Sequence, residues 1–277
     1  MDEVIGGIIQ AAKEFVGVEE GDYIQDGLLY CGKCHTPKQR EYAFPWGTMK
    51  PYMLCRCGRL EQQKREEEKK ALEFIDRVHR LRKDCFPKQE MWRWTFDVDD
   101  GASEKASEVG RRYVECFREM KTAGKGLIFF GPTGTGKTFM AACIANALVD
   151  KGYPCHMTSM SRILNKVQEL REGKQAYIDS LDSYDLLLLD DLGAEGDTEY
   201  RSEIVHNVIN SRYDSALPLV VTTNLTAQQL KNPADMKFKR IYSRLLEMCI
   251  PVEIGGSDRR RQKCRDNFSD YKDMLGL

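Results

Sequence analysis

The octapeptide GPTGTGKT at residues 131–138 decides how the rest of this chain is interpreted. It follows the apolar run LIFF (127–130) and precedes a segment with helical spacing of apolar residues. Glycines allow backbone N–H groups to converge on phosphate oxygens, because residues without a Cβ tolerate the required conformations. In this strand–loop–helix context, the pattern G-x-x-x-x-G-K-S/T predicts a nucleoside triphosphate-binding loop. We assign eight residues to ATP binding: Gly131, Pro132, Thr133, Gly134, Thr135, Gly136, Lys137 and Thr138.

Side chains in and near this loop are candidates for contacts to the phosphates and to Mg²⁺. Lys137 would reach the β and γ phosphates, and Thr138 would coordinate Mg²⁺. The stretch LLLLDDLG (186–193) predicts a buried strand ending in Asp190, whose carboxylate would hold Mg²⁺ directly or through water. Asp191 would point to the other face of the strand, toward the attacking water, as general base. A structural cap for the following turn is the alternative for Asp191.

A polar amide follows another strand candidate, LVVTTN (219–224). Asn224 could hydrogen-bond the γ-phosphate or the attacking water, and a buried amide without such a partner would be costly. The alternative is an asparagine that only forms the turn after the strand.

Arginines recur toward the C-terminal end. The stretch RIYSRLLE (240–247) places Arg240 and Arg244 one helical turn apart on a single face. An arginine delivered to the γ-phosphate of a neighbouring subunit would explain them, because it stabilises transition-state charge. Ordinary surface arginines are the alternative. Arg259, in GGSDRRRQK (255–263), is a candidate contact to the nucleotide of its own subunit or part of a basic turn.

From Lys125 onward, short apolar runs alternate with amphipathic segments. This alternation predicts an α/β fold, in which helices flank a mostly parallel sheet and ligands lie at the carboxyl ends of the strands. The expected strands are 127–130, 155–159, 186–190, 219–224 and 250–254. The expected helices are 137–150, 161–172, 199–215 and 237–247, with further helices at about 1–20, 61–84 and 103–121.

Two cysteine pairs near the N-terminus predict a metal site. CGKC and CRC place Cys31, Cys34, Cys55 and Cys57 at the ends of a segment long enough to fold back into a tetrahedral S₄ site. Zn²⁺ binding would supply stability that so small a core lacks. The C-x-C spacing is unusual, His35 could replace one ligand, and a redox pair is the alternative. Aromatic side chains are expected to pack around the site: Tyr30, Tyr42, Phe44, Trp46 and Tyr52.

Bulk composition says little about partners, because 42 basic side chains face 43 acidic ones. A nucleic-acid role must therefore come from local patches. No segment approaches the roughly 18 apolar residues that span a membrane, and the N-terminus lacks the positive charge of a secretory signal. We expect a cytoplasmic protein without membrane contact. Candidates for contacts to a nucleic-acid backbone, or simply a solvated face, are Arg162, Lys166, Arg171 and Lys174.

Six motifs resemble those of the AAA+ ATPases that load bacterial helicases, the DnaC/DnaI type, and their transposition relatives of the IstB type. They are GPTGTGKT, LLLLDDLG, VVTTNL, INSRY, RIYSRL and the G-x-S-x-R of Gly255, Ser257 and Arg259. The resemblance covers about residues 90–265. It implies an AAA+ parallel sheet with little or no lid, and an ATP hydrolase that is weak until single-stranded DNA or a partner stimulates it.

The same resemblance implies residue roles. Asp190 and Asp191 would act on the metal ion and on the attacking water. Asn224 would sense the γ-phosphate, and Arg244 would be an arginine finger that acts in trans through AAA+ interfaces. Loaders similar to DnaI carry an N-terminal zinc module that contacts the helicase, whereas IstB-type ATPases generally do not. This difference favours helicase loading over transposition.

The sequence therefore predicts a zinc-binding, helicase-interaction module (1–58), a helical linker (59–90) and an AAA+ ATPase domain (91–277). The predicted function is ATP-dependent loading of a hexameric replicative DNA helicase onto single-stranded DNA. The alternatives are an IstB-like transposition ATPase, or a zinc-dependent adaptor with a nucleotide switch.

Overall fold

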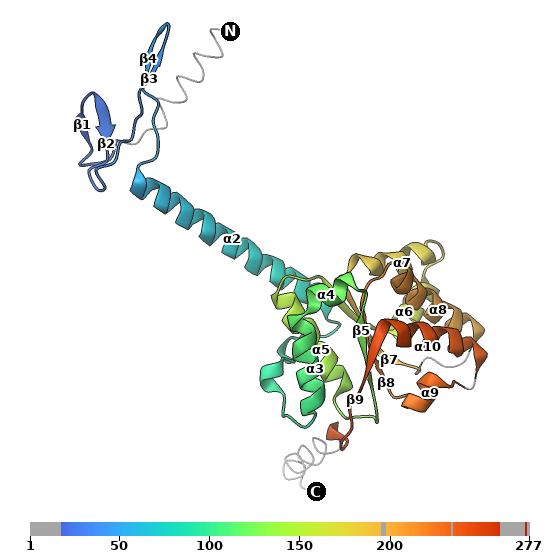
Figure 1. The fold of residues 1–277 in the computed structure, drawn as a ribbon. Helices are drawn as coiled ribbons and strands as arrows, with labels where there is room; N and C mark the ends of the chain where they lie inside the picture. The colour runs from blue at the N-terminus through green and yellow to red at the C-terminus, as the bar shows by residue number, and fades with distance from the viewer. Residues whose placement is uncertain (1–17, 195–197, 234, 261–274, 276–277) are drawn as a thin grey trace. The chain divides into compact units, whose positions relative to one another are not determined.

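The computed structural model describes residues 18–194, 198–233, 235–260 and 275. The chain divides into two compact units, Met1–Ile75 and Asp76–Leu277, and each is described here by itself (Figure 1). The helix expected at about 1–20 falls almost entirely outside the described residues. Among those described, no helix is both long and apolar enough to cross a membrane.

The first unit contains two short β-hairpins. Strand β1 (Tyr23–Gln25) pairs with β2 (Leu28–Tyr30), and β3 (Tyr42–Phe44) pairs with β4 (Gly47–Met49), both antiparallel. Asp26 and Gly27 connect β1 to β2 with φ angles of 51° and 70°. Positive φ at both central residues is the conformation that lets a two-residue turn match the twist of its strands.

The expected packing of aromatic side chains around the cysteines is wrong for four of the five residues. Tyr42, Phe44, Trp46 and Tyr52 are 44%, 40%, 80% and 45% exposed. The rings of Phe44 and Trp46 stack on each other at 5.3 Å between centroids rather than on a core. Tyr30 is half-buried and stacks on Tyr23.

Helix α2 (Arg56–Cys85) begins in the first unit and ends in the second. It ends two residues before Pro87, which disfavours helical backbone at the residue before it. Of the apolar face expected along this helix, Val78 and Leu81 pack against the core of the second unit. Leu72 and Ile75, by contrast, are 64% and 61% exposed.

A five-stranded parallel sheet forms the centre of the second unit, in the order β6-β7-β8-β5-β9. The prediction of an α/β fold with a parallel sheet is confirmed. The observed strands are close to the expected ones: β5 (Gly126–Phe130), β6 (Cys155–Ser159), β7 (Leu186–Leu192), β8 (Leu219–Thr223) and β9 (Cys249–Glu253). Because β7, β8 and β5 are neighbours, the residues that follow them meet at one edge.

Helices cover both faces of this sheet, because alternate strand residues point to opposite sides. On β5, Leu127 and Phe129 pack into one core, while Ile128 packs into the other. The first core includes α3 (Glu104–Glu115), α4 (Phe117–Thr122) and α5 (Lys137–Asp150), with the 3₁₀ turns η1 (Gln89–Arg93) and η2 (Phe96–Val98). The second includes α6 (Met160–Glu169), α7 (Lys174–Ser180), η3 (Leu181–Ser183), α8 (Glu199–Asp214), α9 (Ala227–Lys231) and α10 (Met236–Met248) (Figure 1). The single helix expected at 103–121 is broken at Cys116.

Arg212, in the INSRY motif on α8, is fully buried. Its guanidinium donates hydrogen bonds to the carbonyl oxygens of Leu181, Tyr184 and Pro218 at 3.3, 2.9 and 2.6 Å. Burial lowers its pKa to about 10, so the group remains charged at neutral pH. Arg212 therefore connects α8 to η3 and to the residue that precedes β8. We conclude that its role is structural.

Replacing Arg212 with Met should lower the free energy of unfolding by about 3 kcal/mol, because three carbonyls would lose their donor in a dry environment. Urea unfolding followed by tryptophan fluorescence would measure the change. The matched control is Lys239→Met on the exposed side of α10, expected to change stability by less than about 0.5 kcal/mol. Equal stability of the Arg212 variant and the control would refute the structural role.

Candidate functional site

The loop at 131–138 folds around the ammonium group of Lys137. Gly131, Gly134 and Gly136 adopt φ angles of 141°, 80° and 101°, which side chains rarely permit. A Cβ on Gly131 would lie 2.3 Å from the carbonyl oxygen of Ile254. Lys137 Nζ donates to the carbonyl oxygens of Gly131 at 2.9 Å and Pro132 at 2.7 Å. Burial lowers the pKa of this ammonium group.

A cavity of about 720 Å³ lies against the loop, within the range of about 300–1,000 Å³ typical of ligand pockets. It contains eight of the residues predicted from sequence: Thr133, Gly134, Gly136, Lys137, Thr138, Asp191, Asn224 and Arg259. Of the other assigned loop residues, Thr135 is buried and donates to the Pro132 carbonyl at 2.9 Å. Five lining residues were not predicted: Trp94, Val98, Asp100, Phe139 and Arg260.

Asp190 lies behind the loop and accepts two hydrogen bonds. Thr138 Oγ1 donates to its Oδ1 at 2.8 Å, and Thr222 Oγ1 donates to the same oxygen at 2.6 Å. Burial raises the pKa of this carboxyl group. A carboxylate beside a hydroxyl is the oxygen donor set that suits Mg²⁺, so Thr138 and Asp190 would hold that ion when it accompanies a nucleotide. The role of Thr222 in fixing Asp190 was not predicted.

The backbone geometry that places Asp191 at the cavity differs from the one expected. The pairing of β7 with β8 shifts register between Leu189 and Leu192, and Asp191 has a φ of 55°. Its backbone N–H donates to Thr222 Oγ1 at 3.0 Å. The left-handed conformation, rather than simple alternation along the strand, therefore separates its side chain from that of Asp190. Such backbone outliers cluster at functional sites.

The segment after β9 passes over the loop and carries Arg259. The backbone N–H of Arg259 donates to the Gly134 carbonyl at 3.0 Å. Its guanidinium lies 3.2 Å from the carboxylate of Asp100. Arg259 is therefore placed beside the phosphate-binding loop of its own chain.

Arg244 does not line the cavity, and it belongs neither to the phosphate-binding loop nor to the strand ends beside it. It lies on α10, where its Nη1 is 2.9 Å from His206 Nε2. This position agrees with an action on another subunit, which stays a prediction.

Two aromatic side chains, Trp94 and Phe139, line part of the cavity. Trp94 and Phe139 lie 6.1 Å apart between ring centroids and offer an apolar surface to a flat base. Asn146, buried on α5, donates to the carbonyl oxygens of Met91 and Trp94, both at 2.9 Å. The sequence signal for this aromatic lining is the aromatic cluster MWRWTF before α3, but the loop lies far away along the chain.

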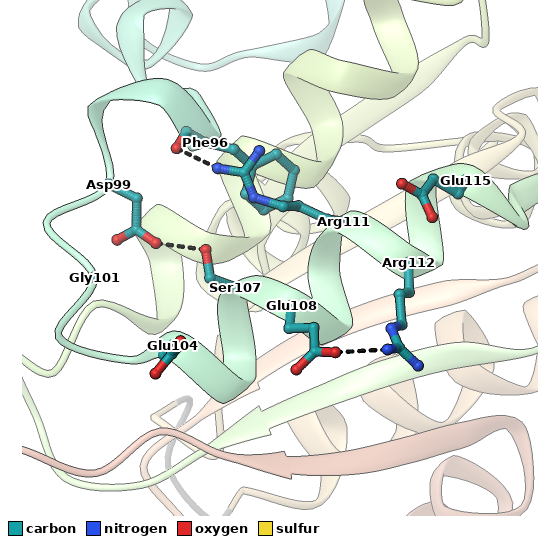
Figure 2. A pocket seen from close by; sticks show the side chains of 9 residues that line it. All are labelled: Phe96, Asp99, Gly101, Glu104, Ser107, Glu108, Arg111, Arg112 and Glu115. Carbon is teal, nitrogen blue, oxygen red and sulfur yellow. Dashed lines mark hydrogen bonds and ion pairs between the residues drawn. The ribbon is translucent and has the colours of Figure 1, made fainter.

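A second cavity, of about 440 Å³, is lined by residues of α3 and of the segment before it (Figure 2). Several of its charged groups bind one another or the backbone: Arg112 pairs with Glu108 at 2.7 Å, and Arg111 donates to the Phe96 carbonyl at 2.7 Å. Ser107 donates to Asp99 at 2.5 Å. Both arginines of this cavity already have partners within the chain, so we assign no ligand to it.

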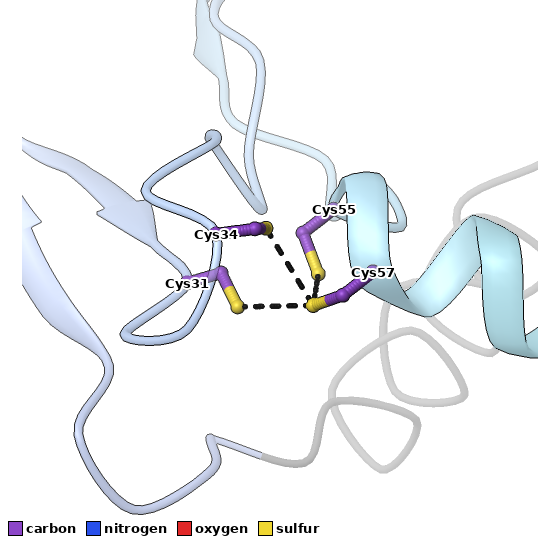
Figure 3. Close-up of side chains that lie close together, drawn as sticks. All are labelled: Cys31, Cys34, Cys55 and Cys57. Atoms are coloured by element: carbon purple, nitrogen blue, oxygen red, sulfur yellow. Dashed lines mark hydrogen bonds between the residues drawn. The ribbon is translucent and has the colours of Figure 1, made fainter.

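The four predicted zinc ligands come together in the first unit (Figure 3). All four Sγ atoms lie within 4.8 Å of one another. Cys57 Sγ is 3.4 Å from that of Cys31, 3.2 Å from that of Cys55 and 3.5 Å from that of Cys34. Sulfurs bound to one Zn²⁺ at about 2.3 Å would be about 3.8 Å apart, close to this arrangement. His35 is not part of the group; its Nδ1 lies 3.3 Å from the Tyr23 hydroxyl.

The chemistry of these thiols also fits a cation. Hydrogen bonds to the neighbouring sulfurs raise the pKa of Cys57 to about 12, because its thiolate would stand among three others. The pKa of Cys34 is lowered to about 5, mainly because the side chain of Thr36 forms a hydrogen bond with its sulfur. A divalent ion would replace the protons that otherwise keep such a crowded group together.

Comparison with known proteins gives one family. The family model for the IstB-like ATP binding protein matches residues 85–267. The replicative helicase loader DnaI of Bacillus subtilis is 26% identical over 207 residues. The loader DnaC of Escherichia coli K12 is 24% identical over 139 residues. A putative insertion sequence ATP-binding protein of Sinorhizobium fredii is 32% identical over 103 residues.

These matches cover parts of each protein. They span 69% of this chain and 66% of DnaI, 49% of this chain and 56% of DnaC, and 36% of this chain and 34% of the insertion sequence protein. A crystal structure of DnaI superposes with a TM-score of 0.52 at 26% identity, over 63% of this chain and 95% of that chain. A crystal structure of the DnaC helicase loader gives 0.54 at 25% identity, over 61% and 100%.

Zinc content provides a direct test of the cysteine site. The purified full-length chain should contain one zinc per chain by atomic emission, and Cys57→Ser should retain less than about a tenth, because three protein ligands hold Zn²⁺ much less tightly than four. Cys116→Ser removes a thiol outside the group and should keep full zinc. Equal zinc in both variants would contradict the assignment.

Proposed function

The chain belongs to the IstB-like ATP-binding protein family, and from this premise we propose that it loads a replicative DNA helicase onto single-stranded DNA in an ATP-dependent reaction. The observation that carries the proposal is the four-cysteine group in the same chain as the nucleotide cavity. Matches to two helicase loaders, one of them over 69% of this chain, support the same function.

ATP hydrolysis would use residues that already surround the cavity. Lys137 would exchange its two carbonyl partners for phosphate oxygens, which compete well because they carry full charge. Thr138 and Asp190 would hold Mg²⁺, whose charge would offset that of the phosphates. Asp191 would accept a proton from the attacking water, and the Asn224 amide would orient that water or the γ-phosphate.

Assembly would complete the catalytic site. The cavity is lined by Arg259 of the same chain, whereas Arg244 lies outside it. We assign Arg244 to the nucleotide of an adjoining copy, where it would stabilise transition-state charge. Hydrolysis would then depend on self-association, and a weak rate for the isolated chain follows from this dependence.

We assign binding of a hexameric helicase to the cysteine-containing segment. The predicted division into residues 1–58, 59–90 and 91–277 assigns helicase binding and ATP hydrolysis to different parts of the chain. Single-stranded DNA would pass along the ATPase domain, and the exposed positions Arg162, Lys166, Arg171 and Lys174 are candidates to follow its backbone.

One comparison favours a second candidate function. The relative from Sinorhizobium fredii has the highest identity of those described above, and its name refers to an insertion sequence. A transposition ATPase would bind duplex DNA and a transposase instead. The short matched length, 36% of this chain, makes this function secondary.

Asp191→Asn should lower the steady-state rate of ATP hydrolysis about 100-fold while leaving nucleotide affinity unchanged, since an amide cannot accept the proton. Lys137→Ala should lower the rate by a similar factor or more, because a charged contact to the phosphates is lost. Phosphate release with single-stranded DNA present, and binding of a fluorescent ATP analogue, would measure the two effects. The control is Asp76→Asn, an exposed carboxylate on α2. An Asp191 variant that hydrolyses ATP at the wild-type rate would exclude Asp191 as the base.

Binding of a helicase should depend on the cysteine group. In a pull-down with a hexameric replicative helicase, full-length Cys57→Ser should lose at least about 10-fold in affinity, because the folded segment depends on its metal. Lys137→Ala should bind as wild type in the absence of ATP. A wild-type chain that binds duplex DNA and a transposase but no helicase would favour the second candidate function.

A further inference from the structure

Two side chains of α8 hold Arg244 in place. Its Nη1 lies 2.9 Å from Nε2 of His206, and its Cζ lies 5.6 Å from the centre of the Tyr213 ring. His206 and Tyr213 are seven residues apart, so they lie on one face of α8, two turns from each other. One edge of the guanidinium group therefore contacts His206, and one of its faces lies over the Tyr213 ring.

The contact with His206 defines where the imidazole proton lies. A guanidinium group has only N–H donors, so His206 must accept the hydrogen bond at Nε2. The imidazole is then neutral and carries its proton on Nδ1. A doubly protonated ring would place two cationic donors against each other.

The partners of Arg244 leave its charge uncompensated. Among the described residues, Arg244 forms no ion pair. Glu247, three residues further along α10, accepts a hydrogen bond from the Tyr213 hydroxyl at 2.9 Å. His206 uses one of the five guanidinium donors, so the others remain available for an anion.

We propose that His206 and Tyr213 form a neutral cradle that presents the charged Arg244 guanidinium to a phosphate group on an adjoining copy of this chain. The proposal rests on the proposed function, in which Arg244 acts on a neighbouring nucleotide. His206 is a positioning residue: it acts through Arg244 and does not line the nucleotide cavity. Holding a long, flexible side chain before assembly reduces the entropy that is lost when it binds phosphate.

A purely structural role for the same contact makes different predictions. If His206 only fastened α8 to α10, its loss would lower stability, and replacement by Gln would bring no selective recovery of turnover. Positioning predicts a lower kcat at an unchanged KM for ATP, since the arginine acts mainly in the transition state. It also predicts rescue by a side chain that accepts a hydrogen bond.

The tautomer of His206 tests the geometry without any assay of activity. In ¹⁵N-labelled full-length protein, with His206 identified by comparison with His206→Gln, we expect a proton on Nδ1 and none on Nε2. Arg244→Ala should remove this preference, because the donor to Nε2 is gone. A proton on Nε2 in the wild-type protein would overturn the proposal.

The rate of ATP hydrolysis tests whether His206 positions Arg244 for catalysis. With single-stranded DNA present, His206→Ala should lower kcat about 10-fold, as expected for a catalytic group that is misplaced rather than lost. His206→Gln should recover to within about 3-fold of wild type, because its amide oxygen can accept from Arg244. Lys239→Ala, which removes another positive charge from α10, is the matched control and should leave turnover unchanged.

The outcomes separate this inference from the proposed function. If Arg244→Ala lowers kcat and His206→Ala does not, the cradle is refuted and the role of Arg244 stands. If Arg244→Ala also turns over normally while Lys137→Ala does not, the action in trans is refuted, and the cradle with it. If the wild-type chain hydrolyses no more ATP than Lys137→Ala, the ATPase function itself fails.

Discussion

The carboxylate of Asp190 accepts hydrogen bonds from Thr138, at the start of α5, and from Thr222, on the neighbouring strand β8. Thr222 in turn accepts the backbone N–H of Asp191. These three bonds connect the phosphate-binding loop to the ends of two strands, so the positions of loop and cavity depend on them. Because the carboxylate is buried, a cation at Asp190 would relieve the cost of its charge while competing for the hydroxyl of Thr138. Cation binding and loop conformation are therefore coupled at this one group.

Much of the second unit could be predicted from the sequence, because its signals are local. The helix at 137–150 and the strand at 155–159 have the expected bounds, since the glycine-rich loop precedes the helix and the stretch KGYP separates the helix from the strand. The aromatic lining of the nucleotide cavity could not be predicted. Trp94 reaches the cavity because buried Asn146 binds the backbone of η1, and no local pattern encodes a contact between segments so far apart.

Two other differences have clear physical causes. The side chains of Asp190 and Asp191 were expected to point in different directions because residues alternate along a strand. A register shift and the left-handed backbone of Asp191 separate them instead. The aromatic residues of the β3–β4 hairpin were expected to pack around the cysteine site, yet they are exposed. So small a unit buries little apolar surface, and two of the four clustered thiols, Cys31 and Cys55, are among its few buried side chains. Hydrophobicity alone therefore does not indicate burial in a unit whose buried side chains include clustered thiols.

The three tryptophans of the chain divide between the two units in a way that makes them optical probes. Trp46 is 80% exposed on the first unit, Trp94 lines the nucleotide cavity, and Trp92 is partly buried against His79. Indole emission shifts toward the blue when water is excluded from the ring. Substituting Trp94 or Trp46 in turn would leave a chain whose fluorescence follows mainly one event: docking of another molecule on the hairpin, or filling of the cavity. The order of the two events could then be timed in unlabelled protein.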